Sequence, residues 1–141
     1  MAIEFVAQTG RRRALRALTT WITVVSLVGF GASVFREPPN AHFGVREWLI
    51  TWLAAALALA GGWSALDLWR LRLAGRATGL MALGLSVVFF GAISLEALRE
   101  ASILSLDFVL PVLAAAFSAV SIPILASRSV ASDLSADRES R

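Results

Sequence analysis

The chain has 141 residues, a length that suits one domain, and carries a net charge of +3. Its residues are 57% hydrophobic and 16% charged, whereas soluble domains average about 45–50% apolar and about 25% charged residues. This composition argues against a soluble globular domain. The absence of cysteine excludes disulfides, thiolate metal sites and thiol redox chemistry.

The chain opens with a basic arm, residues 1–16, which holds Arg11, Arg12, Arg13 and Arg16. Guanidinium groups at the level of the lipid headgroups attract anionic lipids by about 1 kcal/mol each. We therefore predict that these four arginines contact lipid headgroups and anchor the chain.

Four runs without Asp, Glu, Lys, Arg or His follow, and each run is 19 or 20 residues long. A helix of that length spans about 30 Å, the thickness of a bilayer core. The first run exceeds the usual signal-peptide core of about 7–15 residues, which favours a retained helix. The predicted transmembrane domain, residues 17–127, has spans at residues 17–35, 48–66, 77–95 and 101–127.

Arginine is distributed unevenly over the segments between these spans. Ten of the 13 arginines lie before the first span, between the second and third spans, or after the fourth, and three lie on the other side. Short cytoplasmic loops carry an excess of Arg and Lys, so we predict that both termini are cytoplasmic. The predicted fold is an all-α integral membrane four-helix bundle, antiparallel and up-down, in the cell inner (cytoplasmic) membrane. This arrangement explains the positive charge without a nucleic acid partner.

The segments outside the spans carry further signals. Residues 36–47 contain Pro38 and Pro39 and are predicted to form a non-helical outer loop. The tail, residues 128–141, is rich in Ser, Asp and Arg and is predicted to be disordered.

Indole rings favour the boundary between lipid tails and headgroups. All five tryptophans lie near a span end: Trp21, Trp48, Trp52, Trp63 and Trp69.

Small residues in the second and third spans predict close helix contacts, because membrane helices associate through close approach of their backbones. Gly75 and Gly79 form a GxxxG pair, and Gly62 ends a row of small residues at i+4 spacing. Gly84 and Gly91 lie seven residues apart on one face. These glycines fit packing within the bundle, which we favour, or a dimerisation face.

Ionisable residues inside a membrane are functional candidates, and this sequence has none near the middle of a span. Asp67 and Asp107 come closest, at span edges. One interpretation is that both carboxylates belong to an ion path. The interpretation we favour is that they lie at the membrane interface. In that case Asp67 pairs with Arg70 at i+3, and Asp107 pairs with Arg99 or Arg46.

His42 is the only histidine. A haem with two axial histidines from this chain is therefore excluded, and a protein-only zinc site or a catalytic triad has no support. The sequence identifies no cofactor and no metal site, and we expect no enzymatic activity.

We therefore expect a non-catalytic accessory or structural subunit of a larger membrane complex. Its expected partners are membrane lipids and either other membrane protein subunits or a second copy of itself. A small homo-oligomeric transporter or channel is the alternative, and a holin-like membrane-disrupting protein is a further one. All cationic residues are arginine and none is lysine, which indicates a GC-rich bacterial genome.

Overall fold

Four helices account for almost all of the described chain. The computed structural model describes residues 2–35, 44–70, 72–100, 105–128, 130 and 132. The helices are α1 (Ala2–Phe35), α2 (Val45–Trp69), α3 (Ala74–Glu100) and α4 (Leu106–Ala126). Each helix is long and apolar enough to cross a membrane. The prediction of an all-helical fold with four helices able to span a membrane is therefore confirmed over the described residues.

α1, α2 and α3 extend beyond their predicted spans because a helix can continue past its uncharged run, whereas α4 is shorter than its predicted span, 101–127. α1 begins at Ala2, so the described part of the basic arm is helical and continuous with the first span. α2 begins at Val45, inside the predicted outer loop, after Gly44 with an extended backbone (φ −72°, ψ 166°). α4 begins at Leu106 because Ser105 is also extended (φ −71°, ψ 145°).

Several predictions fall on residues that the structure does not describe. These include the loop residues 36–43 with Pro38, Pro39 and His42, and residues 101–104, where the fourth span was predicted to start. Within the predicted disordered tail, the structure describes Arg128, Val130 and Ser132, each with helical backbone. The other tail residues lie outside the described part of the chain.

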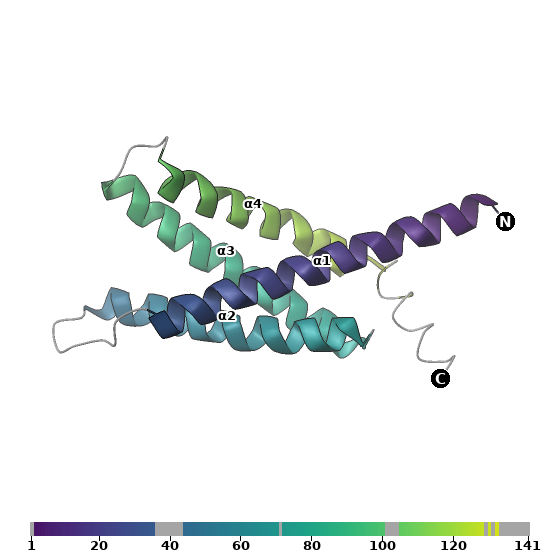
Figure 1. Ribbon diagram of the computed structural model, residues 1–141, viewed down its shortest axis with the longest axis horizontal. Coiled ribbons are helices and arrows are strands. Elements are labelled where there is room, and N and C mark those ends of the chain that lie inside the picture. The colour runs from purple at the N-terminus through teal and green to yellow at the C-terminus, as the bar shows by residue number, and fades with distance from the viewer. Residues whose placement is uncertain are drawn as a thin grey trace.

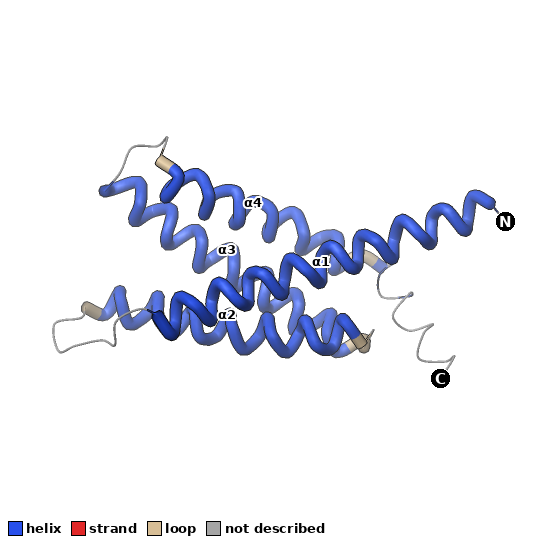
Figure 2. The backbone as a smooth tube through the Cα atoms, in the orientation of Figure 1, coloured by secondary structure: helices blue, strands red, loops and turns tan. Residues whose placement is uncertain are grey.

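The helices form two pairs that meet at one end and diverge toward the other (Figure 1). α1 packs along α2, α3 packs along α4, and α2 also packs along α3, whereas α1 and α4 touch over a short stretch. We call the end with the α2–α3 turn the Asp67 end and the opposite end the Asp107 end. Figure 2 shows α4 as one continuous helix, although it contains Pro111 and Pro123.

Two clusters of buried side chains form the core. The first, at the Asp67 end, draws on all four helices: Leu18, Ile22, Ala65, Leu68, Ala82, Leu83 and Leu125. The second lies toward the Asp107 end and draws on the first three helices: Val25, Ile50, Ala54, Leu57, Phe89 and Phe90. α4 is the least covered helix, with 17% of its span buried against 33–39% for the other three. The tightest packing of all four helices is therefore at the Asp67 end.

Candidate functional site

The turn between α2 and α3 folds back over the last turn of α2. The Arg70 N–H donates to the Leu66 carbonyl oxygen (3.2 Å), and the Arg72 N–H donates to the Asp67 carbonyl oxygen (2.8 Å). These bonds satisfy carbonyl groups that the end of a helix would otherwise leave without a partner. α3 starts two residues later, at Ala74, so the turn sets α3 directly against the end of α2.

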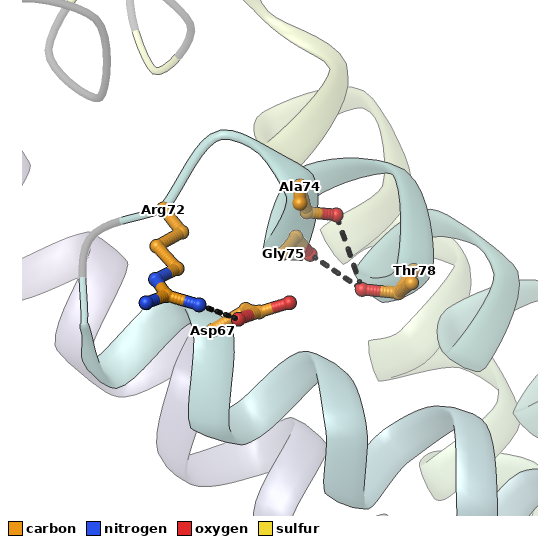
Figure 3. Close-up of polar contacts among 5 residues, drawn as sticks. All are labelled: Asp67, Arg72, Ala74, Gly75 and Thr78. Carbon is orange, nitrogen blue, oxygen red and sulfur yellow. Dashed lines mark hydrogen bonds and ion pairs between the residues drawn. The ribbon is translucent and has the colours of Figure 1, made fainter. Parts of the chain in front are cut away.

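Asp67 is buried beneath this turn, with 8% of its surface exposed. Its Oδ1 lies 3.8 Å from Nη1 of Arg72 (Figure 3). The structure therefore pairs Asp67 with Arg72 rather than with Arg70, the partner predicted from i+3 spacing. The turn brings Arg72 back over the carboxylate, while Arg70 has left the helix and is exposed. The separation of 3.8 Å exceeds the length of a hydrogen bond, so the ion pair is loose.

Gly75 allows α3 to start in contact with α2. A Cβ at this position would lie 2.8 Å from the Leu68 backbone nitrogen and 2.9 Å from the Asp67 Cβ. The Gly75 carbonyl oxygen accepts hydrogen bonds from the hydroxyls of Ser64 (3.1 Å) and Thr78 (3.4 Å). Thr78 also donates to the Ala74 carbonyl oxygen at 3.2 Å (Figure 3). Gly75 therefore combines close packing with a polar link between α2 and α3.

One turn further along α3, Gly79 lies where all four helices meet. A Cβ there would lie 2.8 Å from Cδ2 of Leu125 on α4 and 2.9 Å from Oγ of Ser64 on α2. It would also lie 3.5 Å from Cδ1 of Ile22 on α1. We call this point the Gly79 junction. The predicted GxxxG pair thus lies at helix contacts within the chain.

Arg76, between these two glycines, holds the end of α4. Its Nε–H donates to the Leu125 carbonyl oxygen (3.0 Å), and its Nη2 donates to the Ala126 carbonyl oxygen. Arg76 entered the predicted orientation only as one of the ten arginines on one side, and its contact with α4 was not predicted. An Arg at the start of one helix does not by itself predict such a contact, because the sequence does not show which helix ends beside it.

Two further hydrogen bonds join α1 to its neighbours. Ser26 donates from Oγ to the Ala58 carbonyl oxygen on α2 (2.8 Å). Trp21 donates from Nε1 to Oγ of Ser118 on α4 (3.1 Å), and its ring meets Phe117 edge-to-face with centroids 4.8 Å apart. Trp21 is half-buried and bonds across the molecule, whereas the four α2 tryptophans that were predicted to flank their span are exposed.

Asp107 lies far from this junction. It is exposed on the first turn of α4, and α4 is about 30 Å long at 1.5 Å per residue, with Leu125 near its other end. At the Asp107 end, Arg46 Nη2 pairs with Glu96 Oε1 at 2.8 Å, so this arginine binds Glu96 and not Asp107. The two carboxylates predicted for an ion path therefore lie at opposite ends of the molecule.

Three further buried hydroxyls donate to carbonyl oxygens of their own helices. Ser86 donates to Leu83 (2.9 Å) and Ser94 donates to Phe90 (2.7 Å). Ser121 likewise donates to the Phe117 carbonyl oxygen (2.8 Å). These three donors are already used within their own helices.

The remaining predicted site residues are the arginines of the basic arm and three glycines. Arg13 and Arg16 are exposed on α1, while the side chains of Arg11 and Arg12 lie outside the description. A Cβ at Gly62 would be in ordinary contact with Ser26 Oγ at 3.5 Å. Gly84 and Gly91 have no close neighbour, since a Cβ at either position would meet nothing within 4 Å.

Over the described residues, no group of three or more His, Cys, Asp or Glu side chains is placed to hold a metal ion. Comparison with protein-family models, curated proteins and solved structures finds no match for this chain. The polar side chains that the structure brings together link helices to one another: most lie at or near the Asp67 end, and the pair of Arg46 and Glu96 lies at the Asp107 end.

Proposed function

We propose that the chain is a non-catalytic accessory subunit of a larger membrane complex. The observation that supports this proposal is the use of the polar side chains within the spans. Trp21, Ser26, Ser64 and Arg76 bond across helices, and in membranes such bonds hold helices together. Polar groups committed to packing are unavailable for chemistry on a substrate.

The proposed topology is antiparallel and up-down, with both termini in the cytoplasm of a bacterium and the helices in its inner membrane. The positions of the arginines support this topology. Eight arginines of the described residues belong to segments at the Asp67 end: Arg11, Arg12, Arg13, Arg16, Arg70, Arg72, Arg76 and Arg128. Two belong to the Asp107 end, Arg46 and Arg99. Excess arginine marks the cytoplasmic side.

α4 is the least covered of the four spans and offers a surface for a partner subunit. Its exposed side combines small residues such as Ala116 and Ala119 with large apolar ones such as Leu113 and Val120. Small residues let a neighbouring helix approach closely. We therefore place the partner subunit against α4.

A pull-down at native expression level tests this function. The tagged chain is extracted in mild detergent and analysed by native mass spectrometry, and we expect another membrane protein at fixed stoichiometry. Ala116→Leu together with Ala119→Leu should reduce the captured partner at least tenfold. Ala56→Leu, at an exposed position on α2, is the matched control and should change nothing. A chain that purifies alone at full stability would contradict the proposal.

The alternative is a homo-oligomeric transporter or channel, and the burial of Asp67 favours it. A carboxylate with 8% of its surface exposed and a partner 3.8 Å away is costly in an apolar setting. Ion flux into proteoliposomes should then fall with Asp67→Asn. If Asp67→Asn and Asp107→Asn both leave the flux unchanged, neither carboxylate belongs to a transport site.

A further inference from the structure

Two prolines interrupt the backbone hydrogen bonding of α4. Proline has no backbone N–H, so the carbonyl group four residues earlier in the helix loses its donor. Pro111 therefore frees the carbonyl group of Asp107, and Pro123 frees that of Ala119. Asp107 lies in the first turn of α4, where water can replace the missing donor. Ala119 lies about 20 Å from the start of α4 and about 10 Å from its end, at 1.5 Å per residue, and is therefore inside the span.

The hydroxyl groups beside Ala119 on α4 are engaged elsewhere. Ser121 Oγ donates to the carbonyl oxygen one turn before it (2.8 Å), and Ser118 Oγ accepts from Nε1 of Trp21 (3.1 Å). Both serines are buried, whereas Ala119 and Pro123 are exposed. Residues four apart lie one above the other on a helix, so the freed carbonyl group lies on the outward side of α4.

A freed carbonyl group inside a bilayer requires a donor from elsewhere. Lipid tails offer none, and membrane helices tolerate proline where a neighbouring helix, a hydroxyl side chain or an ordered water satisfies the group that proline leaves unpaired. Ala116 and Ala119 are both exposed, and small residues let a neighbouring helix approach the backbone closely. The outward side of α4 therefore presents a hydrogen-bond acceptor that a neighbouring helix can reach.

We infer that the partner subunit presents a transmembrane helix with a hydroxyl or amide side chain that donates to the Ala119 carbonyl oxygen. This inference rests on the proposed function and specifies the chemistry of its contact. A second copy of the chain does not fit this role through the same face. The exposed positions of α4 from Leu110 to Ile124 are all apolar, and a two-fold interface uses one patch on both subunits. Such a dimer would bring two acceptors together without a side-chain donor.

Replacement of each proline by alanine tests the contact. Pro123→Ala returns an N–H to α4, so the Ala119 carbonyl group is satisfied within its own helix and gains less from the partner subunit. Pro111→Ala is the matched control, because it restores the bond to the Asp107 carbonyl group at the edge of the span. Alanine is the better helix former, so both variants should keep or raise the thermal stability of the chain. Weaker binding would then not reflect loss of the fold.

Native mass spectrometry over a dilution series in mild detergent gives the apparent Kd of the complex. We expect Pro123→Ala to raise it about threefold, the factor for an interhelical hydrogen bond in a membrane, and Pro111→Ala to leave it unchanged. Equal Kd values for the two variants would overturn the inference while the partner subunit stands, as would a complex that contains only copies of this chain. A wild-type chain that binds no other protein would contradict the proposed function as well.

The donor itself can be located on the partner subunit. With p-benzoylphenylalanine in place of Val120, an exposed residue beside Ala119, we expect photo-cross-linking to a transmembrane peptide that contains Ser, Thr, Asn or Gln. Replacement of that residue by alanine should weaken the wild-type complex about threefold and the Pro123→Ala complex no further, because both changes remove the same bond. Full additivity of the two changes would overturn the inference, as would a cross-linked helix that has no such side chain.

Discussion

The Nε–H of Arg76 donates to the carbonyl oxygen of Leu125 at 3.0 Å, which joins the first turn of α3 to the last turn of α4. The last carbonyl groups of a helix lack partners within it, and a cation there complements the helix dipole. One arginine therefore contributes to the positive charge of this end and holds the least covered helix in place.

Removing the charge of Arg76 should release the end of α4. We expect Arg76→Gln to lower the free energy of unfolding by about 1.5–3 kcal/mol, the range for hydrogen bonds to charged groups. Hydrogen exchange in detergent should show faster exchange in the last turn of α4. Arg70→Gln, at an exposed position just after α2, is the control. Equal effects of the two substitutions would contradict the role assigned to Arg76.

Gly75 should not tolerate a side chain. Gly75→Ala would place a Cβ 2.8 Å from the Leu68 backbone nitrogen, which cannot move without shifting α2. Overpacking of this kind costs about 1–3 kcal/mol, measurable as a lower thermal midpoint in detergent. Gly62→Ala brings its Cβ no closer than 3.5 Å to Ser26 Oγ and should be neutral or slightly stabilising. A neutral Gly75→Ala would mean that the two helices are further apart.

The hydrogen bond from Trp21 to Ser118 should couple α1 to α4. In a double-mutant cycle with Trp21→Phe and Ser118→Ala, we expect a coupling energy of about 0.6 kcal/mol, typical of interhelical bonds in membranes. Unfolding of single molecules in bilayers provides the measurement. Trp63→Phe, which alters an exposed ring, should show no coupling to Ser118→Ala. A coupling near zero for Trp21 would show that α1 and α4 are not held together at this point.

The ion pair between Arg46 and Glu96 should contribute little. The two side chains are 50% and 30% exposed, and pairs of this kind stabilise by about 0–1 kcal/mol. We expect Glu96→Gln to lower stability by no more than this amount, and we expect the difference to shrink as salt is raised to 1 M. A larger loss that does not depend on salt would indicate that Glu96 has another partner.

The four spans could be predicted from the sequence because the absence of charge over 19 or 20 residues is itself the physical requirement for crossing a bilayer. Helix ends were harder to predict. Val45, Arg46 and Glu47 are helical although they precede the uncharged run. Backbone hydrogen bonding, and not hydropathy, sets where a helix stops.

The contacts between helices could be predicted only in part. The spacing of Gly75 and Gly79 singled out two residues that pack against other helices, yet equally regular spacing placed Gly84 and Gly91 on an open face. Spacing shows which residues share a face but not which way the face points. The bond between Trp21 and Ser118 joins residues 97 positions apart, and no local pattern carries that information.

The central claim is a four-span bundle with the Asp67 end in the cytoplasm, and labelling of single cysteines from either side of the membrane tests it most directly. Gly10→Cys and Arg72→Cys report on the Asp67 end, and Val45→Cys and Asp107→Cys report on the opposite end, all at exposed positions. With a membrane-impermeant thiol reagent on intact cells, we expect labelling of Val45→Cys and Asp107→Cys only. Labelling of Gly10→Cys or Arg72→Cys from outside would contradict this topology.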